Sequence, residues 1–154
     1  SWRITKVQPS CRRQNLHSYQ HYDILELKKQ DGSSVFNQVM QDNSTPSHRV
    51  REFFIILVNA LASEYLGRCY LLQRKDIVNA LIQILFSQKD QDTSLRQNAL
   101  GALQKFSLRR DAQTIMINLD VIKWIIQILK TEAQENLSEY SLEYTTALLM
   151  NLSL

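Results

Sequence analysis

The residues best suited to bind a metal ion are His17 and His21, which lie four positions apart. Two histidines at this spacing can bind one ion from the same face of a helix, and Cys11 and Asp23 are close to them in the sequence. A zinc site needs further ligands in a fixed geometry, and no H-E-x-x-H or C-x-x-C motif accompanies the pair. We therefore interpret these residues as a polar surface cluster and expect neither a metal ion nor another cofactor.

Motifs for catalysis are also missing from the sequence. There is no G-x-S-x-G turn for a nucleophilic serine, no glycine-rich loop for phosphate, and no carboxylate pair in a recognisable catalytic context. The acidic residues near the C-terminus lie in a polar segment or on the surface of a predicted helix, where carboxylates are normally solvated. They are Glu132, Glu135, Glu139 and Glu143. We expect no enzymatic activity.

Composition predicts one all-α domain. A chain of 154 residues with 44% hydrophobic content can bury a sizeable core. It contains only three Gly and two Pro, whereas β-sandwiches, barrels and nucleotide-binding folds need many turn residues. The chain begins with Ser1 and ends at Leu154 inside an apolar helical pattern, so we expect a fragment of a longer protein.

Charge and cysteine content narrow the class of partner. The 18 Lys and Arg and 15 Asp and Glu give a net charge of +3 and are interspersed, whereas nucleic-acid and membrane surfaces concentrate their charge. The longest apolar run, residues 53–58, is far shorter than the roughly 18 residues of a membrane span. The two cysteines match no disulfide or metal spacing. We expect a cytoplasmic protein that binds neither nucleic acid nor the membrane interior.

A repeat organises the helices. The segment LIQIL at residues 81–85 recurs as IIQIL at 125–129, and FNQVM at 36–40 fits the same template, with offsets of 44 and 45 residues. An aspartate stands five residues before each copy, where a side-chain oxygen can cap the first N–H groups of a helix. These predicted N-caps are Asp31, Asp76 and Asp120.

A second helix follows each copy after a polar link. The three patterns are FFIILVNALA, NALGALQKFSL and TTALLMNLSL, and they align in steps of 46 residues. The links QDNSTPSH, SQKDQDTS and TEAQENLSEYS are predicted to be surface loops. Short helices are also expected near residues 67–74 and 111–118.

A repeat of about 45 residues is typical of armadillo or HEAT units, which bury their apolar faces by stacking into a right-handed superhelix. The predicted boundaries are a linker or capping segment at 1–29 followed by repeats over 30–154. The repeats fall approximately at 30–66, 67–110 and 111–154.

The order of elements resembles the armadillo family, in which a short helix, an apolar helix and a polar loop precede a helix ending in A-L-x-N-L. The third copy ends in LLMNLSL. Within that family, NALGALQKFSLRRDAQTIMI and SEYSLEYTTALLMNLSL resemble the LisH-domain-containing armadillo proteins of ciliary basal bodies, over about residues 49–154. The resemblance implies an armadillo-type α-solenoid and a non-catalytic scaffold for protein partners in cilium assembly, at the basal body or centriole.

The resemblance also implies that the last helix of each repeat lines a concave, partner-binding face. Amide side chains there suit an extended peptide, because each offers a donor and an acceptor. The residues placed on this face are Glu52, Ile55, Asn59, Asn98, Gly101, Lys105, Tyr144, Ala147 and Asn151. An asparagine near a helix end can instead bond to the adjacent loop, and that alternative stays open.

Two columns depart from the pattern of peptide-binding armadillo proteins. The asparagine column is interrupted by Lys105, and the tryptophan column is occupied by Ile55, Gly101 and Ala147, which offer no aromatic shelf. Binding of nuclear-import signals is therefore not expected. An alternative function is a structural, self-assembling repeat module without a peptide groove. Trp124 is predicted to pack in the core of its repeat.

Overall fold

The computed structural model describes residues 8–29, 33–41, 45–88, 91–131 and 137–154. Every regular element in these ranges is a helix, which confirms the all-α prediction for this part of the chain. The chain divides into two units, Ser1–Arg74 and Lys75–Leu154, which are taken in turn.

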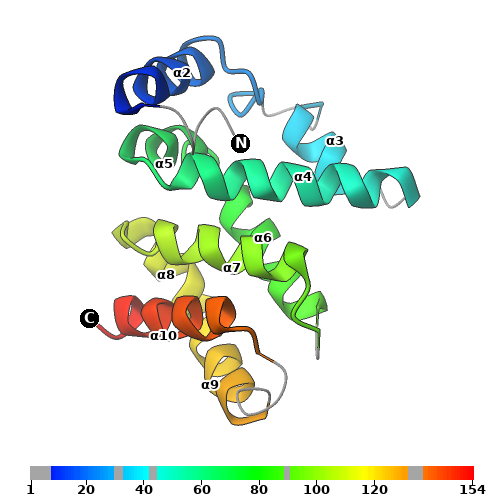
Figure 1. The fold of residues 1–154 in the computed structure, drawn as a ribbon, viewed down its shortest axis with the longest axis vertical. Helices are drawn as coiled ribbons and strands as arrows, with labels where there is room; N and C mark the ends of the chain where they lie inside the picture. Colours follow the sequence, from blue (N-terminus) through cyan, green and yellow to red (C-terminus); the bar gives the residue numbers. More distant parts are fainter. Residues whose placement is uncertain (1–7, 30–32, 42–44, 89–90, 132–136) are drawn as a thin grey trace. The chain divides into compact units, whose positions relative to one another are not determined.

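The first unit is built on a long helix, α4, that packs against α3 and α5, while α2 packs against α5 (Figure 1). The helices are α2 (Pro9–His21), α3 (Val35–Gln41), α4 (Thr45–Ala62) and α5 (Tyr65–Leu71). Phe36 and Phe54 bring α3 and α4 together, with ring centroids 6.0 Å apart. Leu25 and Leu27, after α2, are buried, so the segment predicted as a linker or cap also contributes to the core.

A buried tyrosine fixes the turns that follow α2. The Tyr70 hydroxyl donates a hydrogen bond to Asp23 Oδ1 and accepts one from the backbone N–H of Leu25, both at 2.9 Å. Burial, together with the nearby Asp23 carboxylate, raises the pKa of Tyr70, so its hydroxyl stays protonated. Burial alone would raise the pKa of Asp23, but hydrogen bonds from Lys28, Tyr70 and Leu27 lower it.

The junction between α4 and α5 requires a glycine. A Cβ atom added to Gly67 would lie 1.9 Å from the carbonyl oxygen of Leu61, closer than real Cβ contacts come. The start of α5 therefore lies directly against the backbone at the end of α4. Only a residue without a side chain permits this approach.

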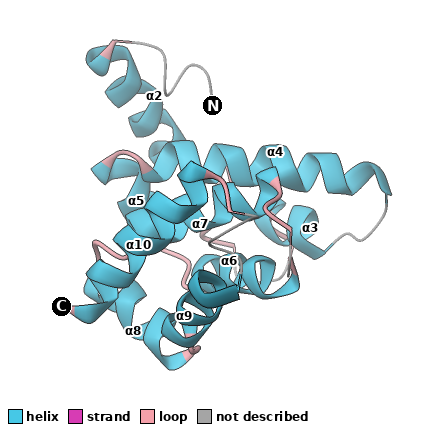
Figure 2. Ribbon diagram, turned by 60° about the horizontal axis from the view of Figure 1, so that its bottom comes forward, coloured by secondary structure: helices cyan, strands magenta, loops and turns pink. Residues whose placement is uncertain are grey.

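The second unit is a pair of helices, α6 and α7, to which α8, α9 and α10 are added (Figure 2). The helices are α6 (Asp76–Ser87), α7 (Ser94–Phe106), α8 (Arg110–Asn118), α9 (Val121–Thr131) and α10 (Glu139–Ser153). The short helices predicted near 67–74 and 111–118 correspond to α5 and α8. The buried positions of α9 follow the helical period that the sequence predicts. They are Val121, Trp124, Ile125 and Ile128.

The core of this unit contains a buried arginine. Arg96 is 1% exposed, and its guanidinium donates to the carbonyl oxygens of Gln88 and Gln91. The same group lies 5.4 Å from the ring centroid of Trp124, in cation–π geometry. Trp124 is 9% exposed, so the prediction that it packs in the core is confirmed.

The described residues include two of the three aspartates that were predicted to be helix N-caps, Asp76 and Asp120. Asp76 is the first residue of α6 and Lys75 holds the N-cap position, so the N-cap prediction is wrong for Asp76. A carboxylate in the first turn still suits the positive end of the helix dipole. Asp31 lies outside the described residues.

Asp120 joins two helices. It has a φ of 60°, a left-handed conformation that aspartate tolerates, and its carbonyl accepts a hydrogen bond from the N–H of Trp124. Its carboxylate contacts Lys123 Nζ at 2.8 Å, on the surface of α9.

Within the described ranges no single helix is long and apolar enough to cross a membrane. The pair α8 and α9 has the necessary length and composition only when the two are taken together, and they are bent by 68°.

The first polar link is shorter than predicted. Residues 41–48 were expected to form a loop, but α3 ends at Gln41 and α4 begins at Thr45. Pro46 falls in the first turn of α4, where its missing N–H has no partner to lose.

Candidate functional site

Most residues of the predicted partner-binding face lie on α7 and α10, which are side by side in the second unit (Figures 1 and 2). Both helices have serine or threonine N-caps. The Thr93 hydroxyl accepts a hydrogen bond from the N–H of Arg96, and the Ser138 hydroxyl accepts one from the N–H of Ser141.

A single carboxylate ties the starts of the two helices together. Asp92, just before α7, accepts a hydrogen bond from the N–H of Ser138 at 2.8 Å and from the Ser141 hydroxyl at 2.6 Å. Gln97 Nε2 donates to the Ser138 hydroxyl at 3.2 Å. We call these four residues the N-terminal clasp. It brings the N-terminal ends of α7 and α10 next to each other.

The clasp carries a negative charge at neutral pH. Burial alone would raise the pKa of Asp92, but the hydrogen bonds from Ser138, Ser141 and Gln97 favour the ionised carboxylate and lower that pKa on balance. The charge also lies near the N-terminus of α10, where the helix dipole favours an anion.

The other ends of the helices are joined through Asn151. Its side-chain amide donates to the Ser107 hydroxyl at 2.8 Å, and its backbone carbonyl accepts from Gln113 Nε2 at 3.2 Å. Gln113 donates to the carbonyl of Ser107 as well. Because the N-terminal ends of α7 and α10 lie together and so do their C-terminal ends, the two helices run parallel. The Asn151 amide thus makes the local loop contact that the sequence left open as an alternative to a peptide ladder.

The remaining predicted residues of this face differ in exposure. Gly101 is buried, so it offers no surface to a partner. The other predicted residues of α7 and α10 are half-buried. They are Asn98, Lys105, Tyr144, Ala147 and Asn151. Asn98 Nδ2 bonds to the carbonyl of Ser94 in its own helix. We call Asn98, Lys105, Tyr140 and Tyr144 the α7–α10 face.

The aromatic pair on α10 was not found from the sequence. Tyr140 and Tyr144 stack with ring centroids 4.2 Å apart and planes 24° apart, and both are half-buried. On α10, the position of the family's tryptophan column is occupied by Ala147, which is not aromatic. The signal that was missed was the spacing of four residues between two tyrosines, which places both on one face of a helix.

The predicted residues of the first unit lie on α4. Glu52 and Asn59 are half-buried, while Ile55 has no exposed surface, so Ile55 cannot contact a partner. The carbonyl of Asn59 accepts a hydrogen bond from the Ser63 hydroxyl. Partner binding by Glu52 and Asn59 stays a prediction.

The histidine cluster has no metal-binding arrangement in the described part of the chain. His17 and His21 are exposed on α2, and Asp23 is engaged by Tyr70 and the following turn. Across the ranges that the structure describes, no group of three or more His, Cys, Asp and Glu side chains could hold a metal ion.

Comparison with known proteins finds a likeness to an armadillo-repeat protein. The family model described as LisH domain-containing protein ARMC9, ARM repeats, matches residues 116–154. LisH domain-containing protein ARMC9 of Rattus norvegicus is 42% identical over 154 residues, covering 99% of this chain and 20% of the relative. The Homo sapiens protein of that name is 40% identical and the Danio rerio protein 34% identical, each with 99% of this chain and 18% of the relative covered.

The chain spans about a fifth of the length of the curated relatives it matches. No solved structure matches it. The likeness extends over almost the whole chain, so it includes α2 and the first unit, which the sequence runs quoted above did not cover.

Proposed function

Because this chain is an armadillo-repeat segment similar along 99% of its length to LisH domain-containing protein ARMC9, we propose that it is a non-catalytic scaffold for protein partners in cilium assembly. Armadillo repeats generally mediate protein–protein interaction. The ciliary setting, at the basal body or centriole, follows from the resemblance of the two runs at residues 98–117 and 138–154 to basal-body proteins.

The observation that carries the proposal is the α7–α10 face. Two parallel helices, tied at both ends, hold a lysine, an asparagine and a stacked pair of tyrosines at half-exposed positions. Stacked tyrosines supply rigid contact area with few side-chain torsions to restrict, and Lys105 adds charge. A surface with these groups on a fixed backbone suits recognition of a protein segment and has no group arranged for catalysis.

In the proposed arrangement the repeats stack into a right-handed superhelix and the α7–α10 face lies on its concave side. An extended segment of the partner lies across α7 and α10. Its backbone meets the amide of Asn98, its side chains meet the tyrosine pair, and an acidic residue meets Lys105.

The test is proximity labelling in ciliated cells with the full-length protein that contains this segment. Two variants alter the face without touching the N-terminal clasp or Asn151: Lys105→Glu and Tyr144→Ala. The matched control is Lys130→Glu, which makes the same charge change at an exposed position of α9. We expect centriolar and ciliary neighbours that both face variants lose and the control retains.

Two results would count against the proposal. If the labelled neighbours are unchanged by Lys105→Glu and Tyr144→Ala, the α7–α10 face does not bind them. If the neighbours belong to nuclear-import or adhesion machinery, the ciliary setting is wrong. Asn151→Ala is less informative, since it also breaks the bond to Ser107.

A second candidate function, self-assembly, is favoured by an apolar stripe on α10. Leu142 and Met150 are 40% and 62% exposed, and they lie eight residues apart on one helical face with Thr146 between them. Multi-angle light scattering decides this case. Self-association that Met150→Lys abolishes supports it, while a chain that stays monomeric at high concentration excludes this stripe as an assembly interface.

A further inference from the structure

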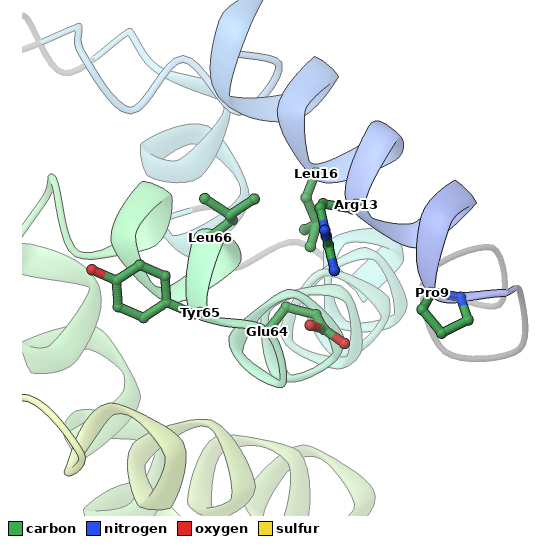
Figure 3. A pocket seen from close by; sticks show the side chains of 6 residues that line it. All are labelled: Pro9, Arg13, Leu16, Glu64, Tyr65 and Leu66. Atoms are coloured by element: carbon green, nitrogen blue, oxygen red, sulfur yellow. The ribbon is translucent and has the colours of Figure 1, made fainter.

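The first unit contains a pocket of about 280 Å³ between α2 and the start of α5. It is lined by Pro9, Arg13, Leu16, Glu64, Tyr65 and Leu66 (Figure 3). Ligand pockets for small molecules begin at roughly this size, at about 300 Å³. The pocket therefore has room for one or two side chains of a partner and not for a large cofactor.

Its lining mixes polar and apolar side chains, and two leucines supply part of the apolar surface. Leu16 is 3% exposed and faces Leu66 across the space between the two helices, while the ring of Tyr65 points away from Arg13 (Figure 3). Leu16 is already almost completely covered, so an aliphatic side chain placed here would remove apolar surface of the half-buried Leu66 from water. A bare inorganic anion would gain nothing from these contacts.

The charge beside the leucines is positive. Glu64 is paired with Arg12 at 2.7 Å, so its carboxylate is already compensated. Arg13 extends into the gap between α2 and Glu64, and it makes no hydrogen bond or ion pair with the residues that the structure describes (Figure 3). The helix that carries both arginines, PSCRRQNLHSYQH, contains no acidic residue. Among the described residues, the Arg13 guanidinium thus has no counter-ion of its own, and it lies beside the half-buried Leu66.

We propose that this pocket binds a short acidic segment of a partner protein, which places an aliphatic side chain against Leu66 and a carboxylate against Arg13. A guanidinium recognises a carboxylate through two parallel N–H···O bonds, which fixes the orientation of the segment. One free arginine beside a glutamate is a poor site for nucleic acid, because binding of a phosphate backbone needs a run of positive charge.

This second site is independent of the proposed α7–α10 face. It lies wholly in the first unit, and its recognition depends on Arg13 and Leu66. Failure of one site in an experiment therefore leaves the other unaffected. A partner that engages both sites would gain avidity from the connection between them.

The test begins with selection of random peptides displayed on phage against the immobilised full chain. A synthetic, fluorescein-labelled copy of the most enriched peptide is then titrated by fluorescence anisotropy. Arg13→Glu reverses the charge at an exposed position, and Arg110→Glu makes the same change in the second unit as a matched control. Glu64→Gln removes the only carboxylate among the lining residues and makes the pocket more positive.

The enriched peptides are expected to carry Leu, Ile or Met next to Asp or Glu. For such a peptide, Arg13→Glu weakens binding about tenfold, because the attraction between Arg13 and the peptide carboxylate becomes a repulsion. Glu64→Gln tightens binding about two- to threefold and Arg110→Glu leaves it unchanged. Higher salt weakens binding to the wild-type chain.

Three outcomes would overturn the proposal. The first is no enrichment. The second is enriched peptides without acidic residues, or peptides whose binding is indifferent to Arg13→Glu although thermal melting shows the variant folded. The third is a peptide that Lys105→Glu releases and Arg13→Glu does not, which assigns it to the α7–α10 face.

Discussion

Replacing Asp92 by alanine tests whether the N-terminal clasp holds α7 and α10 together. The carboxylate accepts two hydrogen bonds, one from the backbone N–H of Ser138 and one from the hydroxyl of Ser141, which is fully buried. A hydrogen bond to a charged group contributes about 1.5–3 kcal/mol, and water can replace part of the contact at a half-buried site. We expect Asp92→Ala to lower the free energy of unfolding by about 2–4 kcal/mol.

The assay is urea unfolding followed by tryptophan fluorescence. The chain has two tryptophans, so a Trp2→Phe background leaves Trp124 as the reporter, in α9 of the second unit. The matched control is Asp111→Ala, an exposed aspartate in the first turn of α8. Its expected loss is below about 1 kcal/mol, since only the interaction with the helix dipole is removed.

A double-mutant cycle with Ser141→Ala separates the clasp from other effects. If Asp92 acts through Ser141, the double variant loses about 1–2 kcal/mol less stability than the sum of the two single variants. A loss below about 0.5 kcal/mol for Asp92→Ala, or strictly additive losses, would refute the clasp as the link between the two helices.

Three further changes follow from single contacts. Tyr70→Phe should cost about 1–3 kcal/mol in urea unfolding, because it leaves Asp23 and a buried backbone N–H without their hydroxyl partner; unchanged stability would contradict this. Gly67→Ala should lower thermal stability by at least about 2 kcal/mol, since its Cβ would meet the Leu61 carbonyl at 1.9 Å, and a variant as stable as wild type would show that the junction adapts freely. The folded-state pKa values of Asp23 and Asp92 are lowered, so their contribution to stability is complete above the ordinary pKa of aspartate and is lost as pH falls through the lowered values. As pH falls, the free energy of unfolding should therefore decrease less steeply for Asp92→Asn than for wild type. Identical slopes would exclude Asp92 as a contributor.

The positions of most helices could be predicted from the sequence. The spacing of apolar residues in α6 and α9 is a local property, and it specifies both the helix and its buried face, including Trp124. The short helices α5 and α8 follow from the same periodicity. The likeness to armadillo repeats was also present in the sequence runs, and comparison with known proteins confirms it.

Helix ends were less predictable, because several residues compete for each cap. Asp76 has the right side chain for an N-cap, but the backbone places Lys75 there. Thr45 and Pro46 read as loop residues and begin a helix instead. The buried state of Ile55 also depends on what packs around α4, which periodicity alone does not specify.

Only the tertiary structure decided which distant residues meet. Asp92 and Ser141 are separated by 49 residues and Arg12 and Glu64 by 52, and no local pattern marks either pair as partners. A hydrogen bond or ion pair forms only where packing brings two backbones within side-chain reach, and packing is a property of whole helices. The sequence therefore determined an all-α chain and its likeness to armadillo repeats. The N-terminal clasp, the stacked tyrosines and the pocket beside Arg13 came from how those helices pack.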